Sequence, residues 1–247
     1  MYSDHPLHGI PEVRKNDDIA ELIIGALGSA GGSLNENDVV VVKQKIVSKA
    51  EGRVVRLEGV KPSRRAVRIA NDLGKEAQLV ELILRESRRI VRMGHGVIIT
   101  ETKHGFVCAN AGIDRSNVES GHAALLPLNP DKSARRIRWS LEKGVGAKLS
   151  VVITDTFGRP WRNGQTDVAI GSSGIEPLQS YRGKVDAYGY TLRVTEPAIV
   201  DEIASAAELA MGKLSAVPVA IVKGLKYRRS EQGTKSMIMP REKDLFR

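Results

Sequence analysis

The residues best suited to chemistry stand where an apolar stretch, residues 149–153, gives way to Thr154, Asp155 and Thr156. Such a stretch predicts a buried strand, and ligands of open α/β sheets bind at the carboxyl ends of strands. A carboxylate there suits Mg²⁺ or Mn²⁺, which prefer hard oxygen ligands, and Thr156 can add a further oxygen. The alternative is an aspartate that only caps a turn, and these residues alone do not decide between the two.

A second oxygen-rich segment, residues 110–117, includes Asp114 and Asn117. One Mg²⁺ commonly takes one or two carboxylates from protein and its remaining ligands from water and phosphate. Asp114 and Asp155 therefore predict a metal site that two different elements bring together. Taken alone, residues 110–117 are more often a turn held by Asx hydrogen bonds.

Basic side chains accompany both acidic segments. Lys45 and Lys49 follow an apolar run, and their ammonium groups can neutralise phosphate oxygens, although a solvated strand end has the same composition. Arg159 and Arg162 follow Asp155 and can bind a phosphate or carboxylate in bidentate fashion. A further set of arginines has the spacing of one helix face, which predicts a solvated surface, an anion-collecting stripe or a partner contact: Arg85, Arg88, Arg89 and Arg92.

Composition limits the class of protein. The chain has 247 residues, 41% of them hydrophobic and 27% charged, which is enough for one large domain or two intimate subdomains. No apolar run reaches the roughly 20 residues that cross a bilayer, and no secretory signal is recognisable, so we expect a cytoplasmic protein. The single cysteine, Cys108, lies in an apolar stretch and is expected to be buried and inert. A net charge of +9 favours anionic ligands.

The elements that must position these residues alternate along the chain and predict a mixed α/β fold. Ser63 is expected to cap a helix that Gly74 ends, and Thr195 a helix that Gly212 ends. Other helices are predicted over residues 17–27, 76–93 and 133–143. Strands are predicted over residues 38–47 (opening with the β-branched run 39–42), 96–109 (as a hairpin), 149–153, 190–194 and 217–222, with residues 228–247 as loop.

Several segments, taken in this order, resemble the coenzyme F420-0:L-glutamate ligase family, also called F420:γ-glutamyl ligases. The block from Thr154-Asp155-Thr156 to Gly164-Gln165-Thr166-Asp167 is long and specific. The resemblance covers essentially the whole chain and is closest to the N-terminal half of fused enzymes that carry a nitroreductase-like second domain. The further matching segments are residues 9–12, 48–53, 110–117, 169–171, 201–204 and 211–213. We therefore expect one ligase unit over residues 1–247, without the nitroreductase-like domain and its flavin chemistry.

The resemblance implies an F420 ligase-like fold with mixed sheets flanked by helices, and a homodimer. It implies that GTP phosphorylates the carboxylate of F420-0, that L-glutamate attacks the acyl phosphate, and that later rounds add γ-linked glutamates. By matching position, Asp114 and Asp155 would hold Mg²⁺ or Mn²⁺, with Thr156 beside a second cation, for which K⁺ is a further candidate. Residues carried over to the GTP pocket are Ile10, Pro11, Glu12, Val13, Gln44, Lys45, Lys49, Asn117, Met211 and Gly212; Arg159 and Arg162 are assigned to substrate.

One position departs from the family pattern. Archaeal members place a glutamate where this chain has Lys213, and that glutamate helps to hold a second metal. A charged lysine cannot do this, so we expect the Lys213 ammonium to supply the charge of that cation and to belong to the catalytic set with Asp114 and Asp155.

Two other functions remain alternatives on sequence alone. A metal-dependent phosphohydrolase would use the same acids with water as the nucleophile. A basic nucleic-acid-binding module would suit the charge, although aromatic residues make up only 4% and base-stacking platforms need them. A P-loop is absent from the sequence, which excludes that class of nucleotide-binding protein.

Overall fold

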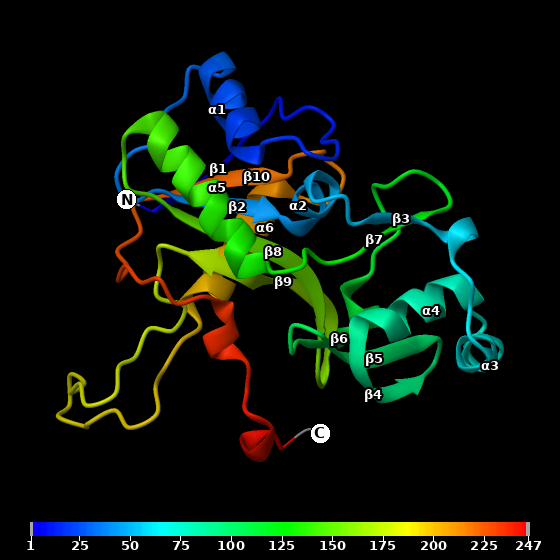
Figure 1. The fold of residues 1–247 in the computed structure, drawn as a ribbon. Helices are drawn as coiled ribbons and strands as arrows, with labels where there is room; N and C mark the ends of the chain where they lie inside the picture. The colour runs from blue at the N-terminus through cyan, green and yellow to red at the C-terminus, as the bar shows by residue number, and fades with distance from the viewer. Residues whose placement is uncertain (1, 246–247) are drawn as a thin grey trace.

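The computed structural model describes residues 2–245, and its largest element is a mixed five-stranded sheet (Figure 1). Its strand order is β1 (Ser3–Pro6), β10 (Val219–Lys223), β2 (Val39–Lys43), β8 (Ser150–Arg159) and β9 (Arg162–Ser173). The β2–β8 pair is parallel and the other neighbours are antiparallel. All four valines of β2 are fully buried because helices cover both faces of the sheet, which explains their unbroken apolar run.

Helices cover both faces of this sheet (Figure 1). On one face α1 (Ile19–Ser29) and α5 (Pro130–Val145) pack against Val40, Val42, Val151 and Ile153. On the other, α6 (Ile199–Met211) packs against Val39, Val41 and Val152. The alternation of side chains along a strand therefore assigns each residue of β8 to one of two separate cores.

A smaller subdomain lies beside the sheet (Figure 1). It contains α3 (Arg64–Leu73), α4 (Ala77–Glu86) and a three-stranded sheet of β4 (Ser87–Gly94), β5 (Val97–Thr102) and β6 (Val107–Ala109). The linking elements are α2 (Gln44–Ala50), β3 (Val54–Arg56), η1 (Leu57–Gly59), η2 (Asn110–Gly112) and β7 (His122–Ala124). This arrangement confirms the prediction of a mixed α/β fold.

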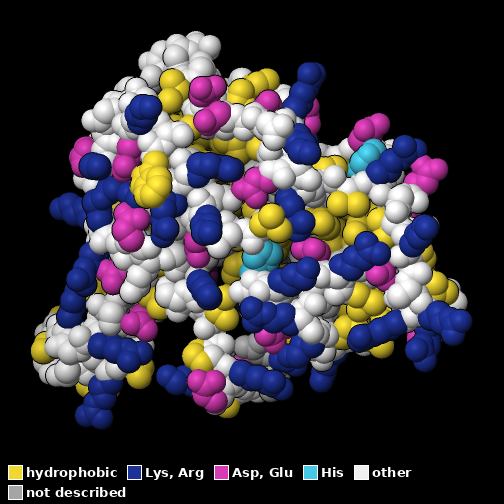
Figure 2. Space-filling view, in the orientation of Figure 1, with side chains coloured by type: hydrophobic (Ala, Val, Ile, Leu, Met, Phe, Trp, Pro, Cys, Tyr) yellow, Lys and Arg dark blue, Asp and Glu magenta, His cyan; other side chains and the backbone are white. Residues whose placement is uncertain are grey.

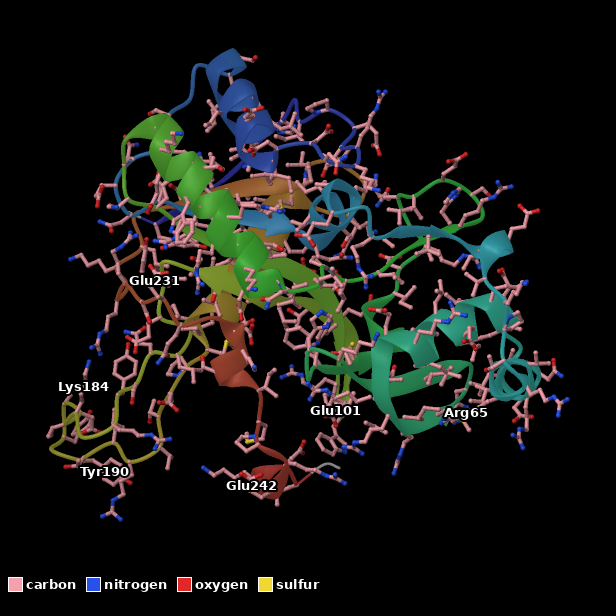
Figure 3. All side chains as sticks on the ribbon, viewed as in Figure 1. Arg65, Glu101, Lys184, Tyr190, Glu231 and Glu242 are labelled. Carbon is pink, nitrogen blue, oxygen red and sulfur yellow. The ribbon has the colours of Figure 1, made fainter. Side chains whose placement is uncertain are left out.

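The predicted helix over residues 76–93 is only half right. It ends at Glu86, and residues 87–94 form β4, which pairs with β5. The Ser87 hydroxyl donates to the Ile83 carbonyl at the helix end, and the β-branched pair Ile90-Val91 fits a strand. The expected arginine stripe on one helix face was therefore wrong, since Arg85 is helical and Arg88, Arg89 and Arg92 lie in β4. Glu101 of β5, labelled in Figure 3, pairs with Arg88 and Arg89.

Three other boundaries differ from expectation. Strand β2 stops at Lys43, and the next residues form α2 rather than continuing to 47. Residues 190–194 form no regular strand but an irregular projection, on which Figure 3 labels Lys184 and Tyr190. Helix α6 begins at Ile199, not after Thr195, because the Thr195 and Pro197 carbonyls accept hydrogen bonds from Tyr181 and Gln179. Strand β9 was not predicted.

Local signals at helix ends were more reliable. Ser63 caps α3 by accepting a hydrogen bond from the Ala66 amide, and Gly74 ends it in the left-handed conformation. Gly212 follows α6 as predicted.

Cys108 is buried, and burial raises the pKa of its thiol to about 12. Short turns, η3 (Thr234–Met237) and η4 (Arg241–Lys243), interrupt the predicted C-terminal loop, whose residues 246–247 lie outside the described range.

None of the helices in residues 2–245 has the length and apolar character needed to span a membrane. Figure 2 shows lysine and arginine side chains spread over the visible face, with acidic side chains between them. The surplus of positive charge is thus distributed over this face rather than gathered in one stripe.

Candidate active site

A cleft of about 1460 Å³ is lined by residues of both subdomains. Most of the residues assigned from the sequence line it, although they come from five separate stretches of chain. Those that do so are Ile10, Pro11, Glu12, Val13, Gln44, Lys45, Lys49, Asp114, Asn117, Asp155, Thr156, Gly212 and Lys213. The fold therefore brings the expected nucleotide and metal residues into one space.

The position of Asp155 follows from the lengths of two parallel strands. Strand β2 ends at Lys43, which pairs with Thr154, so Asp155 is the first residue of β8 beyond its parallel neighbour. Asp155 alternates with Ile153 and Phe157 towards the α1–α5 core, whereas Thr154 and Thr156 face the opposite side with Val152. The side chains of Asp155 and Thr156, although adjacent in the chain, consequently lie on opposite faces of the sheet.

Asp114 lies on a loop of the linking region that is fixed by backbone pairing with Ala124. The Lys45 ammonium is 2.7 Å from its carboxylate, and the Ser116 amide donates to it at 2.7 Å. Burial raises the pKa of Asp114, but the bonds from Lys45 and Ser116 outweigh burial and leave that pKa below its usual value. Asp114 is therefore a carboxylate at neutral pH.

The turn before Asp114 has an unusual backbone. Asn110, Ala111 and Gly112 all have positive φ angles, and Ala111 is buried. A β-carbon on Gly112 would lie 2.8 Å from the Leu126 side chain, so any larger residue there would force Leu126 to shift and would adopt a backbone angle that favours glycine. Such strain persists where surrounding structure fixes it, and here it precedes a cleft-lining carboxylate.

Asp155 differs from the nearby carboxylates of Asp114 and Asp167, because no lysine or arginine in residues 2–245 forms an ion pair with it. Burial of its carboxyl, together with the charges of Asp114 and Asp167, raises the pKa of that carboxyl to about 7. A divalent cation would relieve this repulsion, and two carboxylates supply the hard oxygens that Mg²⁺ or Mn²⁺ requires. In the described residues no three acidic, histidine or cysteine side chains form a metal-binding group, so the other ligands would be water or substrate.

On the opposite side of β8, Asp167 of β9 collects three donors. The hydroxyls of Thr154 and Thr156 donate to its carboxylate at 3.2 and 2.6 Å. The Lys213 ammonium is 3.1 Å from the same carboxylate and 2.5 Å from the Thr156 hydroxyl oxygen. The Thr156 hydroxyl thus lies with Asp167 and Lys213, and its assignment as a metal ligand stays a prediction.

Glu208 of α6 completes this second group. Its carboxylate is 3.0 Å from the Lys213 ammonium and 3.2 Å from that of Lys43. Lys43 also donates to the Gly212 carbonyl just beyond α6, where the helix dipole favours a cation. Burial lowers the pKa of Lys213, but bonds to Glu208 and Asp167 outweigh burial and raise that pKa overall.

The nucleotide candidates lie along another part of the cleft. Gln44 is buried, accepts a hydrogen bond from Ser48 at 2.8 Å, and its amide nitrogen has no partner among the described residues. A buried donor without an acceptor is costly, so this nitrogen is a candidate contact for a ligand. Lys49 is 2.6 Å from Glu12, which ties α2 to the segment of residues 10–13.

Three assigned residues do not line the cleft. Met211 is fully buried in the α6 core. Arg159 and Arg162 lie exposed at the tip of the β8–β9 hairpin, where Arg159 donates to the Asn163 carbonyl, so their assignment to substrate stays a prediction.

Three charged residues of the site, Lys43, Asp167 and Glu208, are not expected there from the sequence. Asp167 closes the Gly-Gln-Thr-Asp block, which was a usable signal. Its pairing with Thr156 required knowledge of the β8–β9 register.

Comparison with known proteins gives one consistent result. The model of the family described as F420-0:Gamma-glutamyl ligase matches residues 9–224. The chain is 48% identical to the coenzyme F420:L-glutamate ligase of Methanothermobacter thermautotrophicus, over 98% of this chain and 97% of that protein. It is 44% identical to the protein of that name from Methanopyrus kandleri, over 96% and 94% of the two chains. For the one from Methanocaldococcus jannaschii the identity is 42%, over 87% and 86%.

Proposed function

This chain belongs to the F420-0:gamma-glutamyl ligase family, and we propose that it joins L-glutamate to the carboxylate of coenzyme F420-0 at the expense of GTP. In further rounds the same site would add γ-linked glutamates to the product. The curated relatives named above carry the name coenzyme F420:L-glutamate ligase, which supports the substrate assignment.

The proposed reaction has two steps. An oxygen of the F420-0 carboxylate attacks the γ-phosphorus of GTP, which forms an acyl phosphate and releases GDP. The amino group of L-glutamate then attacks the acyl carbon, so that an amide forms, inorganic phosphate leaves and one proton is released. All reactants are anionic, so the protein's main task is to position them and to neutralise charge.

The cleft residues fit these tasks. Lys45 and Lys49 line the cleft and would neutralise phosphate oxygens, and the amide nitrogen of Gln44, unpartnered among the described residues, would donate to the nucleotide. Asp114 and Asp155 would hold Mg²⁺ or Mn²⁺, which supplies charge neutralisation at the triphosphate when bound. K⁺ is a further candidate cation. The observation that carries the proposal is the Asp155 carboxylate, which lies in the family's most specific sequence block and lacks a cationic partner among the described residues.

The test is mass spectrometry of the deazaflavin product after incubation with GTP, Mn²⁺ and L-glutamate. We expect the mass of one added glutamate or more, no addition without GTP, and little with ATP. The number of added residues reports tail length in the same spectrum. Phosphate release from GTP that needs neither F420-0 nor glutamate would instead favour a phosphohydrolase.

We also propose a homodimer, on the family resemblance alone. Light scattering coupled to size-exclusion chromatography should give a mass twice that of the 26.9 kDa chain. A monomer that retains full ligase activity would contradict this proposal.

A further inference from the structure

The end of β8 divides four carboxylates of the site into two groups. We call Asp114 and Asp155 the Asp155 side, and Asp167 with Glu208 the Asp167 side. The division follows the strand alternation, which turns Asp155 to one face of the sheet and the Thr154 and Thr156 hydroxyls, with Asp167, to the other.

The Asp167 side is balanced in charge by the protein itself. Its two carboxylates face two ammonium groups, since Lys213 contacts both Asp167 and Glu208, and Lys43 contacts Glu208. The Thr154 and Thr156 hydroxyls and the Lys213 ammonium satisfy the Asp167 oxygens. A divalent cation entering here would have to displace an ammonium group that already bridges two carboxylates.

The Asp155 side has one positive charge fewer. Among the described residues, its two carboxylates have a single ammonium partner, that of Lys45, which forms an ion pair with Asp114. Asp155 has no ion pair in residues 2–245. The imbalance of one negative charge lies at Asp155, which lines the cleft.

We propose that this protein binds one divalent cation, on the Asp155 side, and that the Lys213 ammonium occupies the position between Thr156, Asp167 and Glu208 that a second cation would otherwise take. Lys213 is on this view a positioning residue that fixes the number of metal ions. The inference deepens the proposed function and rests on it for the role of the metal, but the number of bound ions can be measured without any substrate.

The experiment is a titration of the full chain with Mn²⁺, in which electron paramagnetic resonance measures the free ion. We expect about one bound Mn²⁺ per wild-type chain, loss of that ion in Asp155→Asn, and no change in Asp167→Asn. In Lys213→Glu, a third carboxylate would replace the ammonium, and we expect a second bound Mn²⁺. Lys213→Gln replaces the ammonium group with a neutral amide on a slightly shorter side chain, and we expect a second but weaker Mn²⁺ there.

A matched control separates local from general charge effects. Lys103→Glu makes the same change in net charge at an exposed lysine outside the cleft lining, and should leave the number of bound ions at the wild-type value. The inference is overturned if wild type binds two ions and Asp167→Asn removes one. It is also overturned if both Lys213 variants fold but bind only as many ions as wild type.

The two proposals can fail separately. A preparation that shows the expected Mn²⁺ numbers but adds no glutamate to F420-0 would reject the proposed reaction and keep the assignment of Lys213. Ligase activity with two ions in wild type would do the reverse.

Discussion

The two sides of β8 place similar carboxylates in opposite situations. On the Asp167 side, the partners come from the central sheet, the helix α6 and the residues that follow it, and each charge meets an opposite charge. On the Asp155 side, the partners come from the central sheet, the helix α2 and the loop that carries Asp114, and burial with neighbouring carboxylates raises the pKa of Asp155 to about 7. A cluster in which carboxylates and ammonium groups are equal in number stabilises the fold. A cluster that lines a cleft with one carboxylate in excess can bind a cationic ligand.

The largest expected effect is the loss of activity in Asp155→Asn. The substitution keeps the shape of the side chain but removes the charge that would hold the metal. A metal ion stabilises transition-state charge by several kcal/mol, so we expect glutamate ligation to fall by about 10³-fold. The rate of product formation at saturating Mn²⁺ measures this, with Asp186→Asn on the exposed projection as control. Normal turnover in Asp155→Asn would contradict the claim that the Asp155 side binds a metal ion needed for ligation.

The next effect concerns pH and the affinity for Mn²⁺. Asp114 stays ionised because its pKa is lowered, whereas Asp155 must lose a proton that it binds with a pKa of about 7. Below pH 7 that proton competes with the metal, so apparent affinity should weaken by about tenfold per pH unit, and it should level off above pH 7. Mn²⁺ titrations at several pH values test this. An affinity that is constant from about pH 5.5 upwards would contradict the combination of a raised pKa and metal binding at Asp155.

A third effect concerns the strained turn that supports the Asp155 side. Gly112→Ala places a methyl group against Leu126 at a backbone angle that alanine disfavours, and we expect a loss of about 3 kcal/mol in the free energy of unfolding. Gly121→Ala is the matched control, since Gly121 also has a positive φ but no atom within 4 Å of the added carbon. Denaturant unfolding measures both. Equal losses in the two variants would mean that the Leu126 contact is unimportant.

The smallest effect is a change in the free energy of unfolding, which should have opposite signs for substitutions on the two sides. With the metal removed by chelator, Asp167→Asn should lower the free energy of unfolding by about 2 kcal/mol, because buried hydrogen bonds and an ion pair are lost. Asp155→Asn should raise the free energy of unfolding under the same conditions. Its carboxyl has a pKa raised to about 7, so ionisation destabilises the folded state. This cost grows as pH rises from the pKa of the unfolded chain to about 7 and is constant above that pH. Thermal unfolding at about pH 8 measures both, and changes of the same sign would contradict the comparison.

Much of the local structure was predictable because its causes are local. Ser63 begins a helix, and Gly74 and Gly212 end helices, through hydrogen bonds and backbone angles within a few residues of themselves. The run of valines in β2 predicted a strand buried on both faces. Residues 87–94 were misread because their pairing with β5, which the sequence does not display, outweighs the helical spacing of their arginines.

For the site, the sequence by itself determined which chemistry is available: oxygen ligands at Asp114 and Asp155, ammonium groups at Lys45 and Lys213, and the family to which they belong. Only the tertiary structure decided which charges meet. Lys213 lies 46 residues from Asp167 along the chain but 3.1 Å from it in space, and no spacing rule reports such a contact. Electrostatic balance depends on distances between elements, and those distances are set by the packing of β8, β9 and α6.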